Sequence, residues 1–553
     1  MKKYLLFILM TLSSGAFAQV LQWAKSFGGN KFDNGASIAF DSDGNVYTIG
    51  SFEGTVDFDP GPGTFSLVSW GGSDVYVSKL DANGNFLWAK GMGGINDDEG
   101  ISLAIDRLGN IYGAGNFHGG GDFDPDDGTM DLGGLHDFFV LKLDPSGNLM
   151  WAKDAGGDSY DYVFSLALDI TGNVYAAGHF ESGGDFDPGP GTFDLYSPGG
   201  YNMFVLKLDT DGNFVWAKSI GGASYAEGQS IVVDDTGNLY ATGNFHLTVD
   251  FDPDEGNFSL DAAGSSDVFI LKLDSDGKFI WVKQLGGPGP EEAKDIALDQ
   301  FRNILITGTF DGLSDMDPDT GAYELLTNGL LDIFITKLDT DGNFMWAKSV
   351  GGSDLDQGSS IDTDPGGNIL ISGIFRSVAD LDPGEAKRNF VPEGEFDAFI
   401  LKLNPDGDYM WCEQIGSYST DYIALAVDAF GIVFGTGFIG GTTSLGSHEL
   451  TSYGNYDAIV LKIDANITGT SESDQATAVD VYPNPSAKIL NIRSSAFPRG
   501  ATYRIMNLVG VQLTAGLLDN PITSIDIGHF ASGIVILEIE TMQKKASFKI
   551  LKI

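Results

Sequence analysis

The sequence predicts an all-β protein: a seven-bladed β-propeller with four-stranded blades, followed by a small C-terminal β-sandwich. Three observations carry this prediction. A tryptophan motif recurs seven times at nearly constant spacing, each repeat contains four short strand-like runs, and no helical periodicity separates them. Glycine is abundant, at 76 of 553 residues, and aromatic residues reach 12%, as expected for short strands joined by tight turns.

The N-terminus has the features of a secretory signal peptide. Met1-Lys2-Lys3 precede an apolar run from Tyr4 to Leu12, and Ala16-Phe17-Ala18 form an A-x-A cleavage site. The run is too short to span a bilayer, and no second apolar stretch of about 20 residues follows it. We therefore expect residues 1–18 to be removed near Ala18, and the mature chain to have no transmembrane segment.

The charge is strongly negative and unevenly distributed. The formal net charge is −46, which makes binding to a nucleic-acid backbone or an anionic lipid surface unfavourable. Residues 19–478 carry 21 basic and 72 acidic side chains (−51), whereas residues 479–553 carry eight basic and five acidic ones (+3). This difference indicates two domains with separate roles. Cys412 is the only cysteine, so no internal disulfide forms and packing or bound ions must supply stability.

The repeat is defined by tryptophan followed by Ala, Val or Cys and then Lys or Glu. It occurs at Trp23, Trp88, Trp151, Trp216, Trp281, Trp346 and Trp411, with spacings of 65, 63, 65, 65, 65 and 65 residues. Of the eight tryptophans, only Trp70 lies outside the pattern. A period this regular marks a repeat architecture.

Each repeat contains four predicted strands, which in the first are residues 37–40, 46–49, 75–78 and 86–89. The segments Asp41–Asn45 and Asp81–Asn85 join two of these pairs, and both read as hairpin turns. Aspartate or asparagine accepts hydrogen bonds from the turn backbone and glycine supplies positive φ, so turn geometry explains these residues. Four antiparallel strands repeated seven times are typical of a propeller.

The two ends of the repeat region predict how the ring closes. The third strand of each repeat carries a Lys-Leu-Asp type sequence, and after the last of these, at Lys462, no tryptophan strand follows. The missing strand is the one left over at the N-terminus, residues 20–25. We expect it to pair with the strand that holds Lys462, because this pairing would remove an exposed sheet edge.

Two lines of the repeat resemble the β-propeller repeats of secreted bacterial proteins. They are Gly172-Asn173-Val174-Tyr175 with Gly178, and Asp137-Phe138-Phe139-Val140-Leu141-Lys142-Leu143-Asp144. The resemblance covers about Val20 to Asp464. The Gly-His and Trp-Asp signatures of WD40 repeats are absent.

Acidic residues recur in the loops on the face where propellers usually bind. One acid follows each tryptophan by ten residues, with Glu227 one place later in the fourth repeat: Asp33, Asp98, Asp161, Glu291, Asp356 and Asp421. These acids form either a ring of carboxylates at the channel mouth or caps for their own loops.

A second acidic motif, Asp-x-Asp-Pro, begins 34 residues after the tryptophan in six repeats. Its aspartates are Asp57 and Asp59, Asp122 and Asp124, Asp185 and Asp187, Asp250 and Asp252, Asp315 and Asp317, and Asp380 and Asp382. The seventh repeat has Thr442-Thr443-Ser444 instead. Two carboxylates in one turn suit a hard cation, so Ca²⁺ is a candidate cofactor, although no full EF-hand pattern is present. The alternative is an Asx turn stiffened by proline.

Residues that break the repeat are candidates for a specific function. His118, His179 and His246 lie at one end of repeats two to four, where they predict either a transition-metal site or surface histidines without a role. The loops between repeats carry Tyr160, Tyr162, Tyr225, Tyr418 and Tyr422, and a long loop carries Trp70. Tyrosines beside carboxylates suit a sugar ligand, and loop packing is the alternative.

The C-terminal segment resembles the type A sorting domain of type IX secretion cargo. The resemblance rests on Val481-Tyr482-Pro483-Asn484-Pro485, Met506-Asn507-Leu508-Val509-Gly510, Gly533-Ile534-Val535 and Lys549-Ile550-Leu551-Lys552-Ile553. Val535 departs from the family, which often has an aromatic residue there. The resemblance implies export through the inner membrane and recognition of residues 479–553 by the type IX machinery at the outer membrane of a Gram-negative cell.

These observations predict four segments: a signal peptide (1–18), a seven-bladed propeller (19–467), a linker rich in Ser and Thr (468–478) and the sorting domain (479–553). The expected function is a secreted or surface-attached, non-enzymatic binding or adhesion module for an extracellular protein or glycan. The alternatives are a polysaccharide hydrolase or lyase, which requires unlike residues to converge on the channel mouth, and a structural matrix component. No nucleophile elbow, Walker loop or HExxH motif occurs.

Overall fold

The computed structural model describes residues 20–126, 128–254, 256–416, 423–445, 448–465, 479–482, 488–494, 501–507, 512–518, 522–530, 533–540 and 545–552. The predicted signal peptide (1–18) and linker (468–478) lie outside these residues. The chain divides into two compact parts, one covering residues 17–468 and the other holding the C-terminal residues from 469. Every regular element in the described residues is a β-strand. These residues contain no helix long and apolar enough to cross a membrane.

The first compact part contains seven antiparallel groups of four strands, which we number sheets 1 to 7. Sheet 1 is β2 (Asp33–Phe40), β3 (Val46–Asp57), β4 (Ser66–Leu80) and β5 (Phe86–Gly94). Sheet 2 is β6 (Glu99–Ile105), β7 (Ile111–His118), β10 (His136–Leu143) and β11 (Leu149–Gly157). Sheet 3 is β12 (Asp161–Leu168), β13 (Val174–Asp185), β14 (Asp194–Leu208) and β15 (Phe214–Ile220). Sheet 4 is β16 (Ala226–Val233), β17 (Leu239–Phe245), β20 (Asp267–Leu273) and β21 (Phe279–Leu285).

The remaining sheets follow the same order. Sheet 5 is β22 (Glu291–Leu298), β23 (Ile304–Phe310), β26 (Asp332–Leu338) and β27 (Phe344–Gly352). Sheet 6 is β28 (Asp356–Thr363), β29 (Ile369–Phe375), β32 (Asp397–Leu403) and β33 (Tyr409–Ile415). Sheet 7 is β34 (Ile423–Val427), β35 (Ile432–Ile439), β38 (Asp457–Asp464) and the N-terminal strand β1 (Val20–Phe27).

Short hairpins connect the second and third strands of most sheets. They are β8 (Gly121–Asp122) with β9 (Asp131–Leu132), β18 (Thr248–Asp250) with β19 (Ser259–Asp261), β24 (Leu313–Asp315) with β25 (Glu324–Leu326), β30 (Ala379–Asp380) with β31 (Asn389–Phe390), and β36 (Thr442–Leu445) with β37 (His448–Thr451). In sheets 1 and 3 the strands themselves extend into the hairpin.

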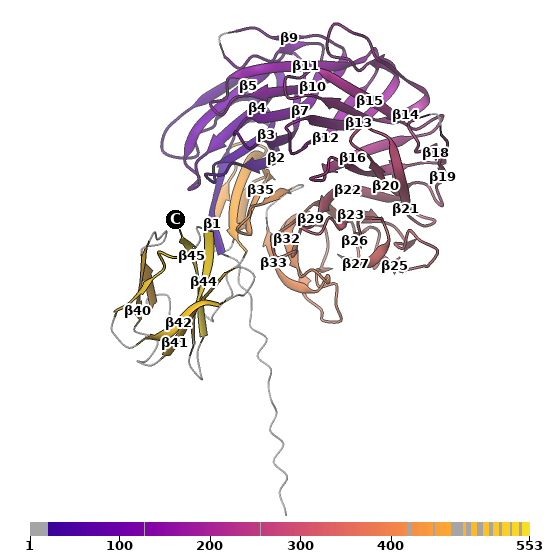
Figure 1. Ribbon diagram of the computed structural model, residues 1–553. Helices are drawn as coiled ribbons and strands as arrows, with labels where there is room; N and C mark the ends of the chain where they lie inside the picture. Colours follow the sequence, from indigo (N-terminus) through magenta and orange to yellow (C-terminus); the bar gives the residue numbers. More distant parts are fainter. Residues whose placement is uncertain are drawn as a thin grey trace, which may run out of the picture. The chain divides into compact units, whose positions relative to one another are not determined.

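The sheets pack face to face, which explains the sequence pattern of their middle strands. All seven residues of β17 and all seven of β20 are buried, because each middle strand is covered on both faces by neighbouring sheets. The innermost strands alternate instead, as in β16, since one of their sides faces the centre. In Figure 1 the sheets follow one another around a common centre, from β2 through β12, β16 and β22 to β35.

Each hydrophobic cluster of this part combines residues from two neighbouring sheets. Seven such clusters join sheet 1 to sheet 2 and so on around the series, and one of them joins sheet 7 back to sheet 1. In that last cluster Phe27 of β1 packs with Phe58 and Tyr76, at ring-centroid distances of 5.1 and 5.6 Å. The innermost strands also contact one another in sequence, and β34 contacts β2.

The predicted pairing of the N-terminal strand is confirmed. Strand β1 pairs antiparallel with β38, and Trp23 lies opposite Lys462. The first residues after the predicted signal peptide therefore form the outer strand of the last sheet.

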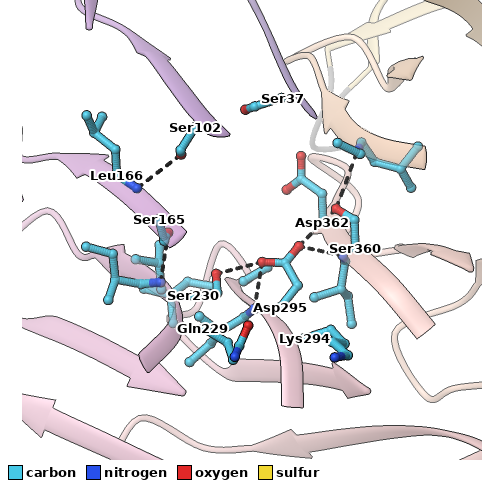
Figure 2. A pocket seen from close by; sticks show the side chains of 18 of the residues that line it. Ser37, Ser102, Ser165, Leu166, Gln229, Ser230, Lys294, Asp295, Ser360 and Asp362 are labelled. Atoms are coloured by element: carbon cyan, nitrogen blue, oxygen red, sulfur yellow. Dashed lines mark hydrogen bonds between the residues drawn. The ribbon is translucent and has the colours of Figure 1, made fainter. Parts of the chain in front are cut away.

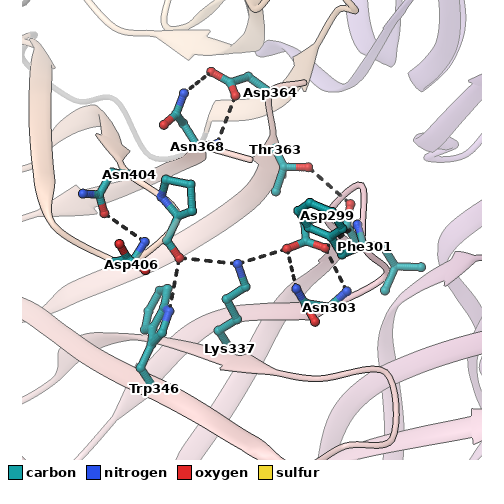
Figure 3. Close-up of polar contacts among 12 residues, drawn as sticks. Asp299, Phe301, Asn303, Lys337, Trp346, Thr363, Asp364, Asn368, Asn404 and Asp406 are labelled. Atoms are coloured by element: carbon teal, nitrogen blue, oxygen red, sulfur yellow. Dashed lines mark hydrogen bonds and ion pairs between the residues drawn. The ribbon is translucent and has the colours of Figure 1, made fainter. Parts of the chain in front are cut away.

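A lysine on the third strand of each sheet binds the backbone of the next sheet. Its ammonium group donates to a carbonyl oxygen near the end of the following sheet's third strand. The pairs are Lys79 with Pro145, Lys142 with Thr210, Lys207 with Ser275, Lys272 with Thr340, Lys337 with Pro405, Lys402 with Ala465, and Lys462 with Ala82, at 2.9–3.4 Å. Figure 3 shows the example of Lys337, which also forms an ion pair with Asp299 at 3.0 Å.

The repeated tryptophan reinforces this lysine contact. The indole Nε1 of Trp346 donates to the Pro405 carbonyl at 3.3 Å, and that of Trp23 donates to the Ala82 carbonyl at 3.2 Å. Because Trp23 and Lys462 belong to sheet 7 and Ala82 to sheet 1, the two ends of the series are joined by the same contact as its other members.

The C-terminal part contains two antiparallel sheets. One holds β39 (Val479–Tyr482), β40 (Ile489–Ser494) and β43 (Ile522–Asp526), and the other holds β41 (Ala501–Asn507), β42 (Gln512–Leu518), β44 (Gly533–Glu540) and β45 (Lys545–Lys552). Both contribute to one core, with Leu490 and Ile525 from the first and Ile505 and Leu537 from the second. Of the sorting motifs, residues 483–485, 508–510 and 553 lie outside the described residues.

Candidate functional site

The innermost strands of all seven sheets line a central cavity of about 880 Å³. Five sheets place a serine fourteen residues after the tryptophan: Ser37, Ser102, Ser165, Ser230 and Ser360. Four of these serines accept a hydrogen bond from a backbone N–H of the next sheet, as Ser102 does from Leu166 at 3.0 Å. Figure 2 shows this arrangement, which links neighbouring innermost strands around the cavity.

Asp295 takes the serine's place in sheet 5. Its carboxylate accepts hydrogen bonds from Ser230 Oγ at 2.8 Å, from Ser360 Oγ at 2.9 Å, and from the backbone of residues 296 and 361. Burial raises the pKa of Asp295 above its usual range, although these hydrogen bonds oppose the shift. The carboxylate therefore joins sheets 4, 5 and 6.

Asp362 is a second acid that only one sheet carries at its position. It accepts from the backbone N–H of Val427 at 2.8 Å and from that of Thr363 at 2.7 Å. Burial, with a smaller effect from Asp295, raises its pKa to about 7. Lys294, Asp295 and Asp362 all line the cavity and do not recur in the other repeats. The carboxylates of Asp295 and Asp362, however, are hydrogen-bonded to neighbouring strands.

The loop acids that follow the tryptophans by ten residues are buried, and they cap their own loops. Five of them accept a hydrogen bond from a glycine N–H four residues earlier: Asp33, Asp98, Asp161, Glu291 and Asp356. Glu227 lies one residue later, and Ala226 occupies the capping position. Asp421 lies outside the described residues. The loop-capping alternative is therefore the one that the hydrogen bonds support.

Each of these acids also lies close to an aspartate at the start of the third strand in the preceding sheet. A Cβ added to Gly93 would lie 2.7 Å from Asp98 Oδ2 and 2.9 Å from Asp74 Oδ1, so the two carboxyls converge on that glycine. The same holds for Asp137 with Asp161 at Gly156 and for Asp332 with Asp356 at Gly351. Asp33 and Asp457 form a fourth pair, between sheets 1 and 7. We call these four the interface acid pairs.

The interface acid pairs are buried without full hydrogen bonding. Asp74, Asp332 and Asp457 are at most 1% exposed, and each has an Oδ1 atom without a partner. Burial raises the pKa of Asp74 to about 7, and the nearby Asp98 adds to this shift. Two carboxylates in such a place repel each other, so one member keeps its proton to a higher pH than an ordinary aspartate does.

Other interfaces avoid this repulsion by substitution. Asn202 stands in place of the third-strand aspartate in sheet 3, where Ala226 stands in place of its acidic partner. The Asn202 amide donates to Ser219 Oγ at 3.1 Å and accepts from Gly222 N–H at 3.0 Å. In sheets 4 and 6 a glutamine amide instead binds the aspartate, as Gln284 binds Asp267 at 2.6 Å.

The Asp-x-Asp-Pro motifs occupy the hairpins and serve their own backbone. In the first, Asp57 Oδ1 accepts from Asp59 N–H at 3.1 Å and from Phe65 N–H at 2.8 Å, and Asp59 Oδ1 accepts from Gly61 N–H at 2.8 Å. The other five repeat this pattern with Asp122 and Asp124, Asp185 and Asp187, Asp250 and Asp252, Asp315 and Asp317, and Asp380 and Asp382. Within the described residues, no group of three or more His, Cys, Asp or Glu side chains is placed to hold a metal ion.

Calcium binding at these hairpins stays a prediction, since paired carboxylates and loop carbonyls suit a hard cation. In two of the motifs a side chain already binds the second oxygen, Asn257 at Asp250 Oδ2 and Arg388 at Asp382 Oδ2. Calcium added to the chelated protein is expected to release heat and to raise the melting temperature. The double variant Asp315→Asn with Asp317→Asn should lose about a sixth of the heat, because one of six equivalent motifs is changed. Neither heat nor a stability gain in the unsubstituted protein would rule the site out.

A continuous row of aromatic and imidazole rings crosses sheets 2, 3 and 4. We call it the aromatic belt, and its members are His118, His136, Tyr160, Tyr162, His179, Tyr201, Tyr225 and His246. Neighbouring ring centroids lie 4.4–6.3 Å apart. Sheets 5 and 6 carry Pro290 and Leu355 where the belt has Tyr160 and Tyr225, so the row breaks the repeat.

The belt has both exposed and buried members. Tyr160 and Tyr225 are 44% and 47% exposed, whereas His179 is buried and its Nδ1 has no hydrogen-bond partner. Burial lowers the pKa of His179 to about 4, so this imidazole is uncharged at neutral pH. Tyr162 Oη lies 3.4 Å from His118 Nε2.

The sequence predicted part of this surface. For His118, His179 and His246 the sequence left open a transition-metal site or surface histidines without a role. Tyrosines separate the three: Tyr162 lies between the first two, and Tyr201 and Tyr225 between the last two. His136 and Tyr201 were missed, although aligning the repeats would have marked both as departures. Tyr418 and Tyr422 lie outside the described residues, and Trp70 is 71% exposed on β4, apart from the belt.

Two family matches define the class of protein. Residues 480–553 match the secretion system C-terminal sorting domain, and residues 280–310 match the beta-propeller repeat. The chain is therefore an all-β protein with propeller repeats and a type IX sorting domain, directed to secretion or to the outer-membrane surface.

Several proteins are similar to this chain over long stretches. An uncharacterized WD repeat-containing protein of Acanthamoeba polyphaga mimivirus is 23% identical, covering 73% of this chain and 35% of the relative. The regulatory protein FlaEY of Caulobacter vibrioides is 29% identical, covering 55% and 30%. The chain thus spans about a third of the length of these curated relatives.

Among solved structures, a protein of unknown function from Dyadobacter fermentans has 12% identity and a TM-score of 0.36, covering 82% of this chain and 99% of that one. PorZ, a surface component of the type IX secretion system of Porphyromonas gingivalis, has 10% identity and a TM-score of 0.26, covering 96% and 100%.

Proposed function

We propose that the protein is a non-enzymatic binding or adhesion module that acts outside the cell and binds its ligand at the aromatic belt. The observation that carries this proposal is the belt itself: eight contiguous rings on one side of the ring of sheets, with Tyr160 and Tyr225 exposed at a position that holds Pro290 and Leu355 in sheets 5 and 6. Function-specific residues are expected where a repeat is broken. Contiguous exposed aromatic surface is typical of binding sites.

The scaffold of this module is a closed propeller of seven blades. Three features support closure: the pairing of β1 with β38, the contact of Lys462 with the Ala82 carbonyl, and the core cluster shared by sheets 7 and 1. The central cavity, lined by the innermost strands of all seven sheets, also agrees with it. A closed ring holds the belt rigidly, which favours binding because little order has to be gained.

The enzymatic alternative requires unlike side chains that are free to act on a substrate. Lys294, Asp295 and Asp362 do meet at the cavity wall, but Asp295 and Asp362 accept hydrogen bonds from the strands that they join. Their roles are those of inter-sheet links, so binding at the belt is the better supported function.

The sorting domain supplies the route to the surface. Deleting residues 479–553 is expected to abolish export and leave the propeller in the periplasm, because the outer-membrane machinery would no longer recognise the chain. Fractionation and immunoblotting of the medium, cell surface and periplasm would measure this. As a control, the Tyr160→Ala variant, which leaves the sorting domain intact, should be exported normally. Normal export of the deletion variant would contradict the assignment.

Binding itself is tested with the purified, fluorescently labelled mature protein on intact cells and extracellular matrix from the producing culture. We expect saturable binding that falls at least about tenfold in affinity in the double variant Tyr160→Ala with Tyr225→Ala. Tyr323→Ala is a matched control, because Tyr323 is 41% exposed in the hairpin between β23 and β26, outside the belt. Binding no better than that of an unrelated acidic protein would refute the proposed function.

A further inference from the structure

We infer that the ligand of the aromatic belt is a glycan chain without acidic groups, either neutral or carrying amino sugars. This inference rests on the proposed function and specifies its ligand. It follows from the ring faces that the belt exposes, from the polar atoms between them, and from the charges that surround them.

The belt offers stacked rings around Tyr160 and edge-to-face rings further along. Tyr160 lies stacked on His136, at a centroid distance of 4.4 Å and an interplanar angle of 24°, and is followed by Tyr162 at 6.0 Å and 29°. Further along, Tyr201 and Tyr225 lie 5.6 Å apart. The face of a tyrosine ring is electron-rich, so it attracts the weakly positive C–H groups on the flat side of a pyranose. The two exposed rings, Tyr160 and Tyr225, lie at separate points along the belt, which suits an extended chain of sugars better than a single small molecule.

Polar groups accompany the rings. Glu181 and Glu227 influence Tyr201, and Glu99 influences Tyr162, so carboxylates lie beside the middle of the row. Carboxylates and tyrosine hydroxyls accept hydrogen bonds from sugar hydroxyl groups and amines.

The charges select the class of glycan. The charged groups that act on Tyr162 and Tyr201 are glutamates, and Glu227 is influenced by Glu292 as well as by His246 and Lys294. Residues 19–478 as a whole carry 21 basic and 72 acidic residues, a net charge of −51. Such a surface repels uronic acids and sulfated sugars, and it attracts protonated amino sugars.

The test is a binding panel with the full-length mature protein. The panel holds a soluble β-glucan, a mannan, a chitosan oligosaccharide, alginate, polygalacturonate and oligolysine. We expect binding to at least one of the first three polymers, none to alginate or polygalacturonate, and a loss of affinity of about tenfold for Tyr160→Ala and for Tyr225→Ala. Tyr323→Ala should bind as the unsubstituted protein does, and the melting temperatures of the variants verify that each is folded.

Several outcomes would overturn the inference: binding to the anionic polymers, binding to oligolysine alone, no binding to any glycan, or binding to a glycan that both tyrosine variants retain. Its failure is distinguishable from that of the proposed function. If the labelled protein binds cells through Tyr160 and Tyr225 but ignores every glycan, the binding module stands and only the ligand class is wrong.

Discussion

Unfolding of the mature protein is expected to require a higher temperature or more denaturant at pH 5 than at pH 8. The cause is the interface acid pairs. Burial raises the pKa of Asp33, Asp98, Asp161 and Asp332 to about 6 and that of Asp74, Asp137 and Asp356 to about 7, and neighbouring acids add to most of these shifts. In the unfolded chain these groups have a pKa near 3.8.

The direction follows from proton linkage. A carboxyl with a raised pKa binds its proton more tightly in the folded state, so its contribution to stability is complete below the unfolded value of 3.8. This contribution is lost as the pH rises through the folded value of about 6–7. With about 1.36 kcal/mol for each pKa unit, the titration of one member of a pair should lower the free energy of unfolding by about 3–4 kcal/mol between pH 4 and pH 8.

The turn aspartates set the lower limit of the stable range. Hydrogen bonds from Asn85 lower the pKa of Asp81, and other turn aspartates behave alike. Their contribution is present above the unfolded pKa and is lost as the pH falls through the lowered value. Stability should therefore be greatest in the mildly acidic range, between about pH 4 and pH 6.

A matched pair of variants isolates the effect. Asp332→Asn combined with Asp356→Ala copies the interface that already carries Asn202 and Ala226. Ser349 is at the position of Ser219 and is expected to accept a hydrogen bond from the new amide, as Ser219 does from Asn202. This variant should lose less stability than the unsubstituted protein between pH 5 and pH 8. The control Asp81→Asn copies Asn404 at the same turn position and should leave that difference unchanged. Urea unfolding in a chelator at constant ionic strength measures both, and equal stability at the two pH values would exclude the mechanism.

Removing strand β1 is expected to destabilise the propeller strongly. Deletion of residues 20–27 exposes the edge of β38, removes the Trp23 contact with the Ala82 carbonyl, and leaves a cavity where Phe27 packs. Phe27 is 2% exposed, so Phe27→Ala alone should cost about 3–5 kcal/mol, and the deletion more.

Thermal unfolding of the purified variants measures this effect. Leu87→Ala is a suitable control, because Leu87 lies on the outer strand β5 and is 47% exposed. Its melting temperature should stay close to that of the unsubstituted protein. A deletion variant that melts normally would show that β1 does not close the ring.

Much of the fold was predictable because each of the seven repeats carries the same strand and turn pattern. The seven tryptophans gave the period, and the absence of a tryptophan strand after Lys462 predicted the pairing that β1 and β38 form. The extra hairpin strands, such as β18 and β19, were missed because they have only three residues each. Two such short runs carry too little alternation to be recognised.

The candidate site was harder to predict, because it depends on distances across sheets. Tyr201 and Tyr225 lie in different repeats and meet only through the packing of sheets 3 and 4. The interface acid pairs could be predicted only in part. The repeat marks the acids ten residues after tryptophan, but it does not mark their partners on the third strands, such as Asp74. No sequence spacing reveals that two carboxyls converge on one buried glycine.

The pairing of β1 with β38 also determines when the protein can finish folding. Strand β1 is synthesised first but pairs with β38, residues 457–464, which are synthesised after the strands of sheets 1 to 6. Strand β1 therefore has no partner until that point. Contacts between such distant segments form slowly, because a long loop has to close first. Until then the edge of the last sheet is a template for foreign strands, and a molecular chaperone that shields it would have its greatest effect in this interval.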